Sequence, residues 1–338
     1  MIRFNNDYNR AAHARVLQEL NQSAGQSFAG YGEDEICARA AARVRQLAET
    51  PEAAVYFLPG ATQANFITVT AALSPVQSVI CADSGHIWAH EAASIEHAGR
   101  KLLPLPQQNG KITAGQIRRE ASRYFDGGAP EYLTEPHLVY ISFATEWGTL
   151  YSLRELEAIS AVCREYNLLL FVDGARMGYA LGAEGNDVTL RDFGRLADAF
   201  YIGGTKCGAL FGEALVLTNK ALQRSFKTYM KQNGAVLAKG WLIGLQFDAL
   251  LRDGLYFDIC ARADRLADKL RAAFAAKGLS FVCPNTTNQI FVVLTEAQKA
   301  ALSGAFTFED EGDCVRFCTA WSTTEEEAAA LCAAIERL

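Results

Sequence analysis

The sequence of 338 residues has no apolar stretch long enough to cross a membrane. Its longest apolar runs, such as residues 168–172 and 209–211, are far shorter than the roughly 20 residues that a spanning helix needs. Residues 1–10 also lack the apolar core of a secretory signal. We therefore expect a cytoplasmic protein that has no membrane partner.

The sequence also lacks a strong excess of either charge. Lys and Arg number 32 against 38 Asp and Glu, which gives a net charge of -6 spread without long runs of one sign. Binding to a phosphate backbone or to an anionic lipid surface requires concentrated positive charge. We therefore expect no nucleic-acid partner.

Cysteine is present nine times, but without a disulfide or redox pattern. The residues are scattered from Cys37 to Cys332, and Cys314 and Cys318, the closest pair, do not form a CxxC motif. We expect reduced, mostly buried thiols. The sequence has no internal repeat, low-complexity tract or Pro/Ser-rich linker either.

Several catalytic motifs are absent. Neither GxGxxG nor GxxxxGK[ST] occurs, and residues 203–208 (GGTKCG) lack the glycine before Lys206 and the hydroxyl residue after it. Residues 25–29 (GQSFA) fail the GxSxG elbow at their last position. His86, His90 and His97 permit a zinc hypothesis, but HExxH is not met and no cysteine joins them, so we expect no metal.

What is present is the pattern of an α/β protein. Hydrophobic residues make up 50% and charged residues 21%, as in ordinary globular chains. Short apolar runs alternate with segments of helical period, which predicts a mainly parallel sheet between helices. The expected strands are residues 55–58, 78–81, 138–143, 168–172, 199–202 and 214–217. Ser152 and Glu155 form a capping box at the start of a helix over residues 152–166.

The pattern changes after about residue 240. A helix over residues 258–277 is followed by short strands at 289–294 and 315–318 and by a closing helix with Thr323 and Glu326 as its capping box. We expect a large domain over residues 1–240, with an N-terminal arm, and a small C-terminal α/β domain over residues 241–338. Without a flexible linker, the two should share a firm interface.

Three segments together match what pyridoxal phosphate (PLP) requires of a protein. Lys206, in a loop of small residues after a strand, could form an aldimine, and Asp173 at an earlier strand end could keep the pyridine nitrogen protonated. Residues 60–65, with Thr62, begin a helix whose amide groups could bind the phosphate. Taken singly, each has a plainer interpretation: a capping aspartate, a solvated lysine and a capped helix.

These residues carry a resemblance to a known family. The sequence resembles the low-specificity L-threonine aldolases within the aromatic amino acid β-eliminating lyase group, which are fold-type I PLP enzymes with a transferase-like fold. DGAR at 173–176 and GGTK at 203–206 are its most specific segments. Weaker ones run in family order across nearly the whole chain: residues 31–34 (YGED), 59–65 (PGATQAN), His86 with Glu91, 144–149 (ATEWGT) and 315–316 (VR).

The resemblance implies roles for individual residues. Lys206 would hold PLP beside Thr205 and Arg176, Asp173 would face the ring nitrogen and His86 would stack on the ring. The phosphate would lie at Gly60, Ala61 and Thr62, and the substrate carboxylate at Arg176, Arg316 and Asn6, the last standing where the family commonly has serine. Arg316 could instead be a surface cation. Tyr31 could reach a neighbouring subunit, because family sites lie at the interface of a homodimer or homotetramer, or could be a core residue.

The implied reaction is cleavage of the Cα–Cβ bond of L-threonine or L-allo-threonine to glycine and an aldehyde. His86 could transfer protons or only stack. Some aldolases have a histidine in the segment where this chain has Glu146 and Trp147, and we expect Trp147 to alter side-chain preference. β-Elimination on the same scaffold remains an alternative, as does a non-catalytic PLP-binding homologue.

Overall fold

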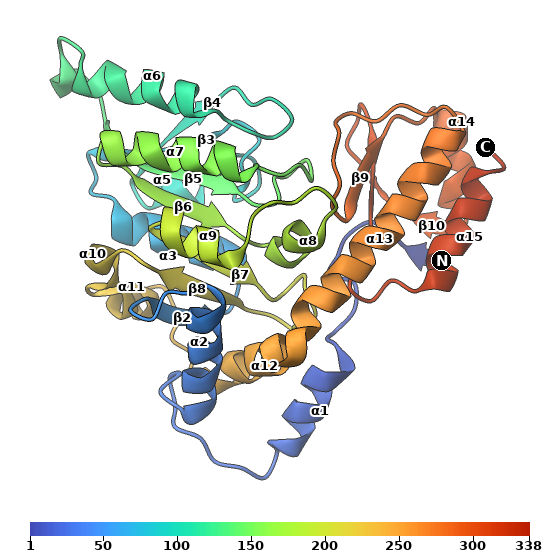
Figure 1. Cartoon of the computed structure of the whole chain (residues 1–338), viewed down its shortest axis with the longest axis horizontal. Coiled ribbons are helices and arrows are strands. Elements are labelled where there is room, and N and C mark those ends of the chain that lie inside the picture. Colours follow the sequence, from blue (N-terminus) through green and yellow to red (C-terminus); the bar gives the residue numbers. More distant parts are fainter.

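The structure, a computed structural model, describes all 338 residues and has two lobes, both visible in Figure 1. The larger lobe is built on a seven-stranded sheet in the order β2-β8-β7-β6-β5-β3-β4, in which all strands run parallel except β8. The strands are β2 (Ala54–Leu58), β3 (Gln77–Ala82), β4 (Lys101–Leu105), β5 (Glu135–Ser142), β6 (Leu169–Asp173), β7 (Ala199–Gly203) and β8 (Glu213–Leu217).

Helices cover both faces of this sheet because alternate side chains of its strands are apolar on both sides. In β6, Leu170 and Val172 belong to one core, whereas Phe171 belongs to the other. The helices of this lobe are α1 (Ala14–Gln22), α2 (Glu35–Leu47), α3 (Ala61–Ala72), α4 (His86–Ala89), α5 (Ser94–His97), α6 (Ala114–Phe125), α7 (Leu153–Glu165), α8 (Met177–Gly182), α9 (Leu190–Leu196), α10 (Lys220–Gln223), α11 (Phe226–Gln232) and α12 (Trp241–Leu251).

The smaller lobe contains a three-stranded antiparallel sheet, β11 (Glu309–Asp310), β12 (Val315–Cys318) and β9 (Gln289–Val292). The helices α13 (Leu255–Ala276), α14 (Glu296–Ser303) and α15 (Glu325–Ile335) belong to it. At the opposite end of the chain, β1 (Ile2–Arg3) pairs with β10 (Phe306–Thr307), and Phe4 lies in the core of this lobe. Both termini therefore lie in the smaller lobe (Figure 1).

The position of the domain boundary remains our proposal. The packing of the helices favours a boundary later in the chain than residue 240. Helix α12 packs against α2 and α1 of the large lobe, while the long helix α13 continues from there to α15 in the small lobe (Figure 1). We place the boundary within α13 and assign Ile2–Arg3 to the small domain. The short pairing of β1 with β10 depends on a distant segment and leaves no local sequence pattern.

The expected elements are present, with local differences. The helix after residue 323 begins one residue later than expected, since Thr324 and Glu327 form its capping box. Strand β4 was not expected, because Pro104 interrupts its apolar run; the strand lies at the edge of the sheet, where proline is tolerated. No helix is long and apolar enough to span a membrane. All nine cysteines are free thiols, and only Cys332 is not fully buried.

The close approach of β6 and β7 generates a test of the fold. A Cβ atom on Gly174 would lie 1.8 Å from the backbone oxygen of Tyr201, so the backbone leaves no room for a side chain at residue 174. We expect Gly174→Ala to lower the free energy of unfolding by about 3 kcal/mol, measured by urea denaturation. Gly304→Ala is the control, since no atom lies within 4 Å of its Cβ position. Equal stability of the two variants would contradict this packing.

Candidate active site

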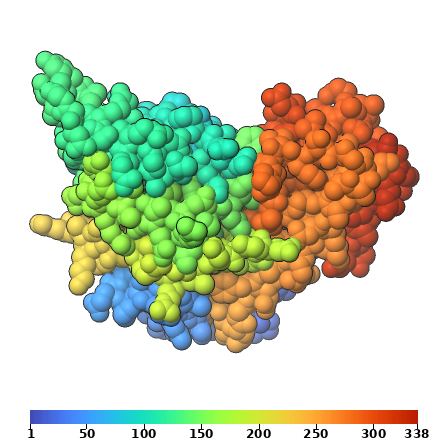
Figure 2. Space-filling model, turned by 45° about the horizontal axis from the view of Figure 1, so that its top comes forward, coloured from blue at the N-terminus to red at the C-terminus, as the bar shows by residue number.

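The candidate residues meet at the carboxyl ends of the parallel strands. Gly60 follows β2, His86 follows β3, Glu146 follows β5, Asp173 ends β6 and Lys206 follows β7. In an open α/β sheet, ligands bind at this edge. The small domain reaches the same edge, and Figure 2 shows a notch between the orange lobe and the green and teal lobe.

Asp173 is buried at the centre of this edge. Its Oδ2 accepts hydrogen bonds from the Tyr140 hydroxyl (2.5 Å) and from Asn65 Nδ2 (3.0 Å), and Oδ1 accepts from the Ala175 amide (2.9 Å). Burial opposes ionisation, but the nearby charge of His86 and these hydrogen bonds keep the pKa of Asp173 below its usual value. Asp173 is therefore a fixed negative charge.

His86 is held at both its backbone and its ring. Its amide N–H donates to Glu146 Oε1 (2.9 Å), and its Nδ1 lies 2.8 Å from Glu91 Oε1. Burial alone would lower the pKa of His86, but the bond to Glu91 and the charges of Asp173 and Glu91 raise it. Because Asn65 Nδ2 bridges Glu91 (2.8 Å) and Asp173, the imidazole and the aspartate belong to one network.

Lys206 lies in the turn after β7 with its amine unpaired. No hydrogen bond or ion pair engages Nζ, although the Lys206 carbonyl accepts from the Tyr179 hydroxyl at 2.6 Å. Burial and the positive charge of Arg176 lower the pKa of Lys206, against the opposing influence of Asp7 and Asp173. A lowered pKa increases the fraction of neutral amine, the form that can react with an aldehyde.

Arg176 is engaged by a residue of the N-terminal arm. Its Nε and one terminal nitrogen donate to the two carboxylate oxygens of Asp7 at 2.8 and 3.1 Å, and Asn288 Nδ2 donates to the same carboxylate at 3.0 Å. Asp7 is fully buried, which opposes its ionisation, but the charges of Arg176 and Lys206 and the hydrogen bonds from Arg176 and Asn288 together lower its pKa. Asn6, the neighbour of Asp7, accepts a bond from the Tyr8 amide.

Arg316, on β12 of the small domain, is only loosely held. Its nearest anion is Glu311 at 3.4 Å, and its buried Nε has no hydrogen-bond partner. Burial and the charge of His86 lower the pKa of His90, and the charges of Arg316 and Lys206 lower it further. A guanidinium with an unsatisfied buried donor is suited to accept a carboxylate.

The start of α3 has the features of a phosphate site. Gly60 provides no side-chain cap, and no atom lies within 4 Å of its Cβ position. The first-turn amides, which include those of Ala61 and Thr62, have no intrahelical acceptor, and Thr62 is exposed. Together with the unpaired amine of Lys206 and the fixed charge of Asp173, these residues fit the requirements of PLP.

Two expected residues have other contacts. The Thr205 hydroxyl donates to Glu213 Oε1 (2.8 Å) and accepts from the Gly212 amide (3.0 Å), so its proton is already engaged. The Trp147 ring packs against Phe291 with centroids 5.0 Å apart, so it contacts the small domain. The roles expected for both remain predictions.

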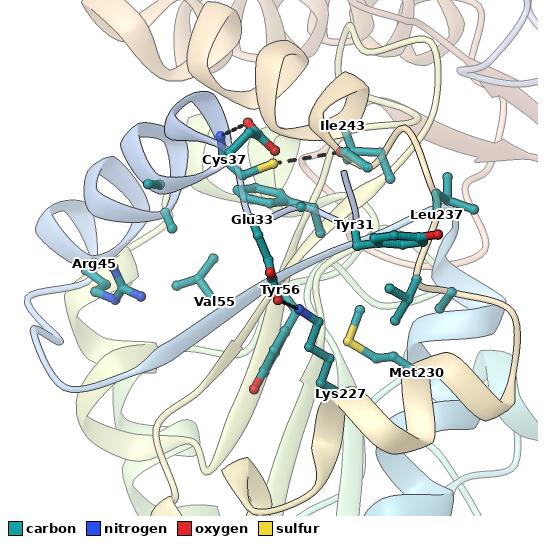
Figure 3. Close-up of a pocket in the computed structure, with 18 residues that line it drawn as sticks. Tyr31, Glu33, Cys37, Arg45, Val55, Tyr56, Lys227, Met230, Leu237 and Ile243 are labelled. Carbon is teal, nitrogen blue, oxygen red and sulfur yellow. Dashed lines mark hydrogen bonds and ion pairs between the residues drawn. The ribbon is translucent and has the colours of Figure 1, made fainter. Parts of the chain in front are cut away.

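Tyr31 is not brought together with Lys206. Figure 3 shows it in a separate pocket of about 320 Å³ between α2, β2 and α11, where Glu33 and Lys227 form an ion pair. Its ring is half exposed, with the Lys231 amine 5.0 Å from its centroid. In the single chain Tyr31 is therefore a surface residue, neither a core residue nor part of the Lys206 site.

Sequence reasoning missed the residues that hold the site together. Asp7 as the partner of Arg176, Tyr140 as a donor to Asp173 and Glu213 beneath the Lys206 turn were not expected. The only signal was a polar group within an apolar strand, such as Tyr140 in β5. No group of three or more His, Cys, Asp or Glu side chains is placed to hold a metal ion.

Comparisons with known proteins identify the family of the chain. The family model described as Beta-eliminating lyase matches residues 13–297. A low specificity L-threonine aldolase of a Pseudomonas species is 33% identical over 312 residues, covering 90% of this chain and 88% of the relative. That of Pseudomonas aeruginosa is 35% identical over 310 residues, covering 88% and 86%.

Solved structures give the same result. A threonine aldolase of Leishmania major superposes with a TM-score of 0.96 and 39% identity, covering 100% of this chain and 99% of that one. An aspartate aminotransferase of Thermus thermophilus has a TM-score of 0.74 at 15% identity, covering 100% and 91%, and therefore supports the fold alone.

The buried pair of Asp7 and Arg176 generates a stability prediction. We expect Asp7→Asn to lower the free energy of unfolding by about 3 kcal/mol at neutral pH, because it leaves a buried guanidinium unpaired. The folded-state pKa of Asp7 is depressed, so this stabilisation is present above the ordinary aspartate pKa of about 3.9 and is lost as the pH falls below it. The difference in the free energy of unfolding between the wild type and the variant should therefore become smaller at acidic pH.

The measurement is urea denaturation at several pH values. Asp253→Asn is the control, because Asp253 forms an exposed ion pair with Arg15 at 3.5 Å, and such pairs contribute little. A gap that stays constant down to the most acidic pH would show that the Asp7 charge does not stabilise the fold.

Proposed function

Because the chain belongs to the beta-eliminating lyase family, we propose that it is a PLP-dependent aldolase that cleaves L-threonine and related β-hydroxy amino acids to glycine and an aldehyde. The observation that carries this proposal is the placement of an unpaired Lys206 amine and a buried Asp173 carboxylate at neighbouring strand ends.

PLP supplies an electron sink for the carbanion that forms at the substrate Cα. In this proposal Lys206 would hold its aldehyde carbon and Asp173 would keep its ring nitrogen protonated. The amides at the start of α3 would bind its phosphate, and His86 would contact its ring. Tyr140 and Asn65 keep Asp173 ionised and oriented toward the ring.

The substrate carboxylate is bound by Arg316 and oriented near Arg176. Arg316 contributes most, because its buried Nε has no other partner, whereas the fork of Arg176 is engaged by Asp7. A fixed carboxylate would hold the substrate Cα in one orientation and so select which of its bonds is cleaved. Asn6 adjoins this position beside Asp7.

Proton transfer at the β-hydroxyl is assigned to His86. Its Nδ1 faces Glu91, so Nε2 is the nitrogen left to exchange a proton. Burial raises the pKa of Glu146, whose carboxylate accepts from the His86 amide and from Ser142 Oγ (2.6 Å). Glu146, which belongs to the segment 144–149, therefore fixes the position of the His86 backbone.

We further propose a cytoplasmic homodimer or homotetramer with the site at the subunit interface. Tyr31 supports this arrangement, because its half-exposed ring lies outside the Lys206 site of its own chain and is free to reach a second copy.

The lysine assignment has a spectroscopic test. We expect the wild type with added PLP to show the visible absorbance of a lysine-bound cofactor, and borohydride to fix PLP on Lys206, as mass spectrometry would show. Lys206→Ala should lose both signals, whereas Lys220→Ala, at the start of a surface helix, should keep them. A wild type that shows neither signal would exclude PLP.

Product analysis decides the reaction. Glycine with acetaldehyde from L-threonine supports aldol cleavage. Pyruvate with ammonia from a serine or cysteine derivative supports β-elimination, which the same lysine and aspartate could serve. The absence of products from both substrates would indicate a PLP-binding protein without catalysis.

The His86–Glu91 pair predicts a pH dependence. As a base, His86 must first lose its proton, and Glu91 raises its pKa, so the rate of threonine cleavage should rise with pH through a limb above the ordinary histidine range. Glu91→Gln removes that charge, and we expect the limb to move down by about 1 pH unit. Glu96→Gln, an exposed change on α5, should leave it in place. Coincident profiles would indicate that His86 only stacks.

A further inference from the structure

Glu213 is a buried acid that the assigned roles leave unused. It begins β8, is only 2% exposed, and lies opposite Gly203 of β7 and Leu58 of β2. Its Oε2 accepts a hydrogen bond from the Gly204 amide at 2.9 Å, and its Oε1 accepts one from the Thr205 hydroxyl at 2.8 Å. Both carboxylate oxygens therefore bond to the two residues that precede Lys206.

The turn that carries Lys206 is also held by other hydrogen bonds, which include the one from the Tyr179 hydroxyl to the Lys206 carbonyl. The Gly204 and Thr205 amides donate to the Gly212 carbonyl at 3.0 and 3.2 Å, and the Gly212 amide returns a bond to the Thr205 hydroxyl. Tyr256 donates to the Gly203 carbonyl at 2.8 Å. The Glu213 carboxylate thus supplies the side-chain acceptor of a closed loop between the end of β7 and the start of β8.

Glu213 has no cation within ion-pair distance, so its charge is balanced through space. Burial raises the pKa of Glu213 to about 8, against the bonds from Thr205 and Gly204 and the positive charge of Lys206. In return, the carboxylate of Glu213 opposes the lowering of the Lys206 pKa. The other titratable groups that act on this pair are Asp7, Asp173, Arg176, Tyr201 and Tyr256.

We propose that Glu213 is a positioning residue for Lys206: it holds the Gly204–Thr205 turn, and its charge controls how readily the lysine amine loses a proton. This inference rests on the proposed role of Lys206 in binding PLP. When Glu213 is ionised it favours the ammonium form of Lys206, and when it is protonated it releases the neutral amine. The two groups therefore titrate as a pair rather than independently.

The test follows the reaction of cofactor-free protein with PLP across a range of pH. The rate at which the visible band appears should rise with pH as the Lys206 amine is deprotonated, in two overlapping steps for the wild type. Glu213→Gln keeps the size of the side chain and removes its charge, so the profile should collapse to one step with a midpoint about 1 pH unit lower.

Matched variants separate charge from packing. Glu213→Asp keeps the charge and should retain a wild-type midpoint. Thr205→Val removes the hydrogen bond that favours the ionised form of Glu213, so the profile should keep its two steps while the step of Glu213 moves to higher pH. Glu135→Gln, a half-buried glutamate bonded to Gln77 at the amino end of β5, should change neither. Circular dichroism would confirm that each variant is folded.

A second measurement follows the Glu213 carboxyl group itself. The infrared difference between the wild type and Glu213→Gln, both without cofactor, should contain a protonated carboxyl band that disappears near pH 8. The absence of that band, or a Glu213→Gln profile that superimposes on the wild type, would overturn the proposal. A wild type that forms no band with excess PLP would instead contradict the proposed function.

Discussion

The structure depends on the burial of a cluster of opposite charges at the carboxyl ends of its central strands. Burying a charge is costly unless partners and hydrogen bonds compensate for it. Asp7 compensates Arg176, and Tyr140 and Asn65 stabilise the negative charge of Asp173. Lys206 alone has no direct partner. The surrounding acids balance its charge through space, and its amine stays free for chemistry.

This cluster also explains why distant parts of the chain are held together. Asp7 comes from the N-terminal arm, Arg176 from the large domain and Asn288 from the small domain, and all three meet in one set of hydrogen bonds. The arm is fixed at its other side by the pairing of β1 with β10. The site therefore forms only when both domains and the arm are in place, and a shift of the small domain would alter the surroundings of Arg176.

The one antiparallel strand of the seven-stranded sheet, β8, contributes to the same site. Because β8 runs against its neighbours, its first residue lies beside the last residue of β7, where the lysine turn begins. Glu213 consequently contacts the turn that precedes Lys206, although it lies eight residues after Thr205 in the sequence. A parallel strand would place its carboxyl end at that edge. The reversal of one strand thus brings a buried acid to the turn that carries the lysine.

The sequence by itself determined the α/β class, the strands that carry Asp173 and Lys206, and the helix start at Gly60, because apolar periodicity and capping boxes are local signals. It also supported the family resemblance through short motifs. Only the tertiary structure decided that Asp7 pairs with Arg176 and that Glu213 holds the lysine turn. Such contacts join residues that are far apart in the chain or that lie on antiparallel strands. They form only once the domains have packed, because only then are these charged groups buried together.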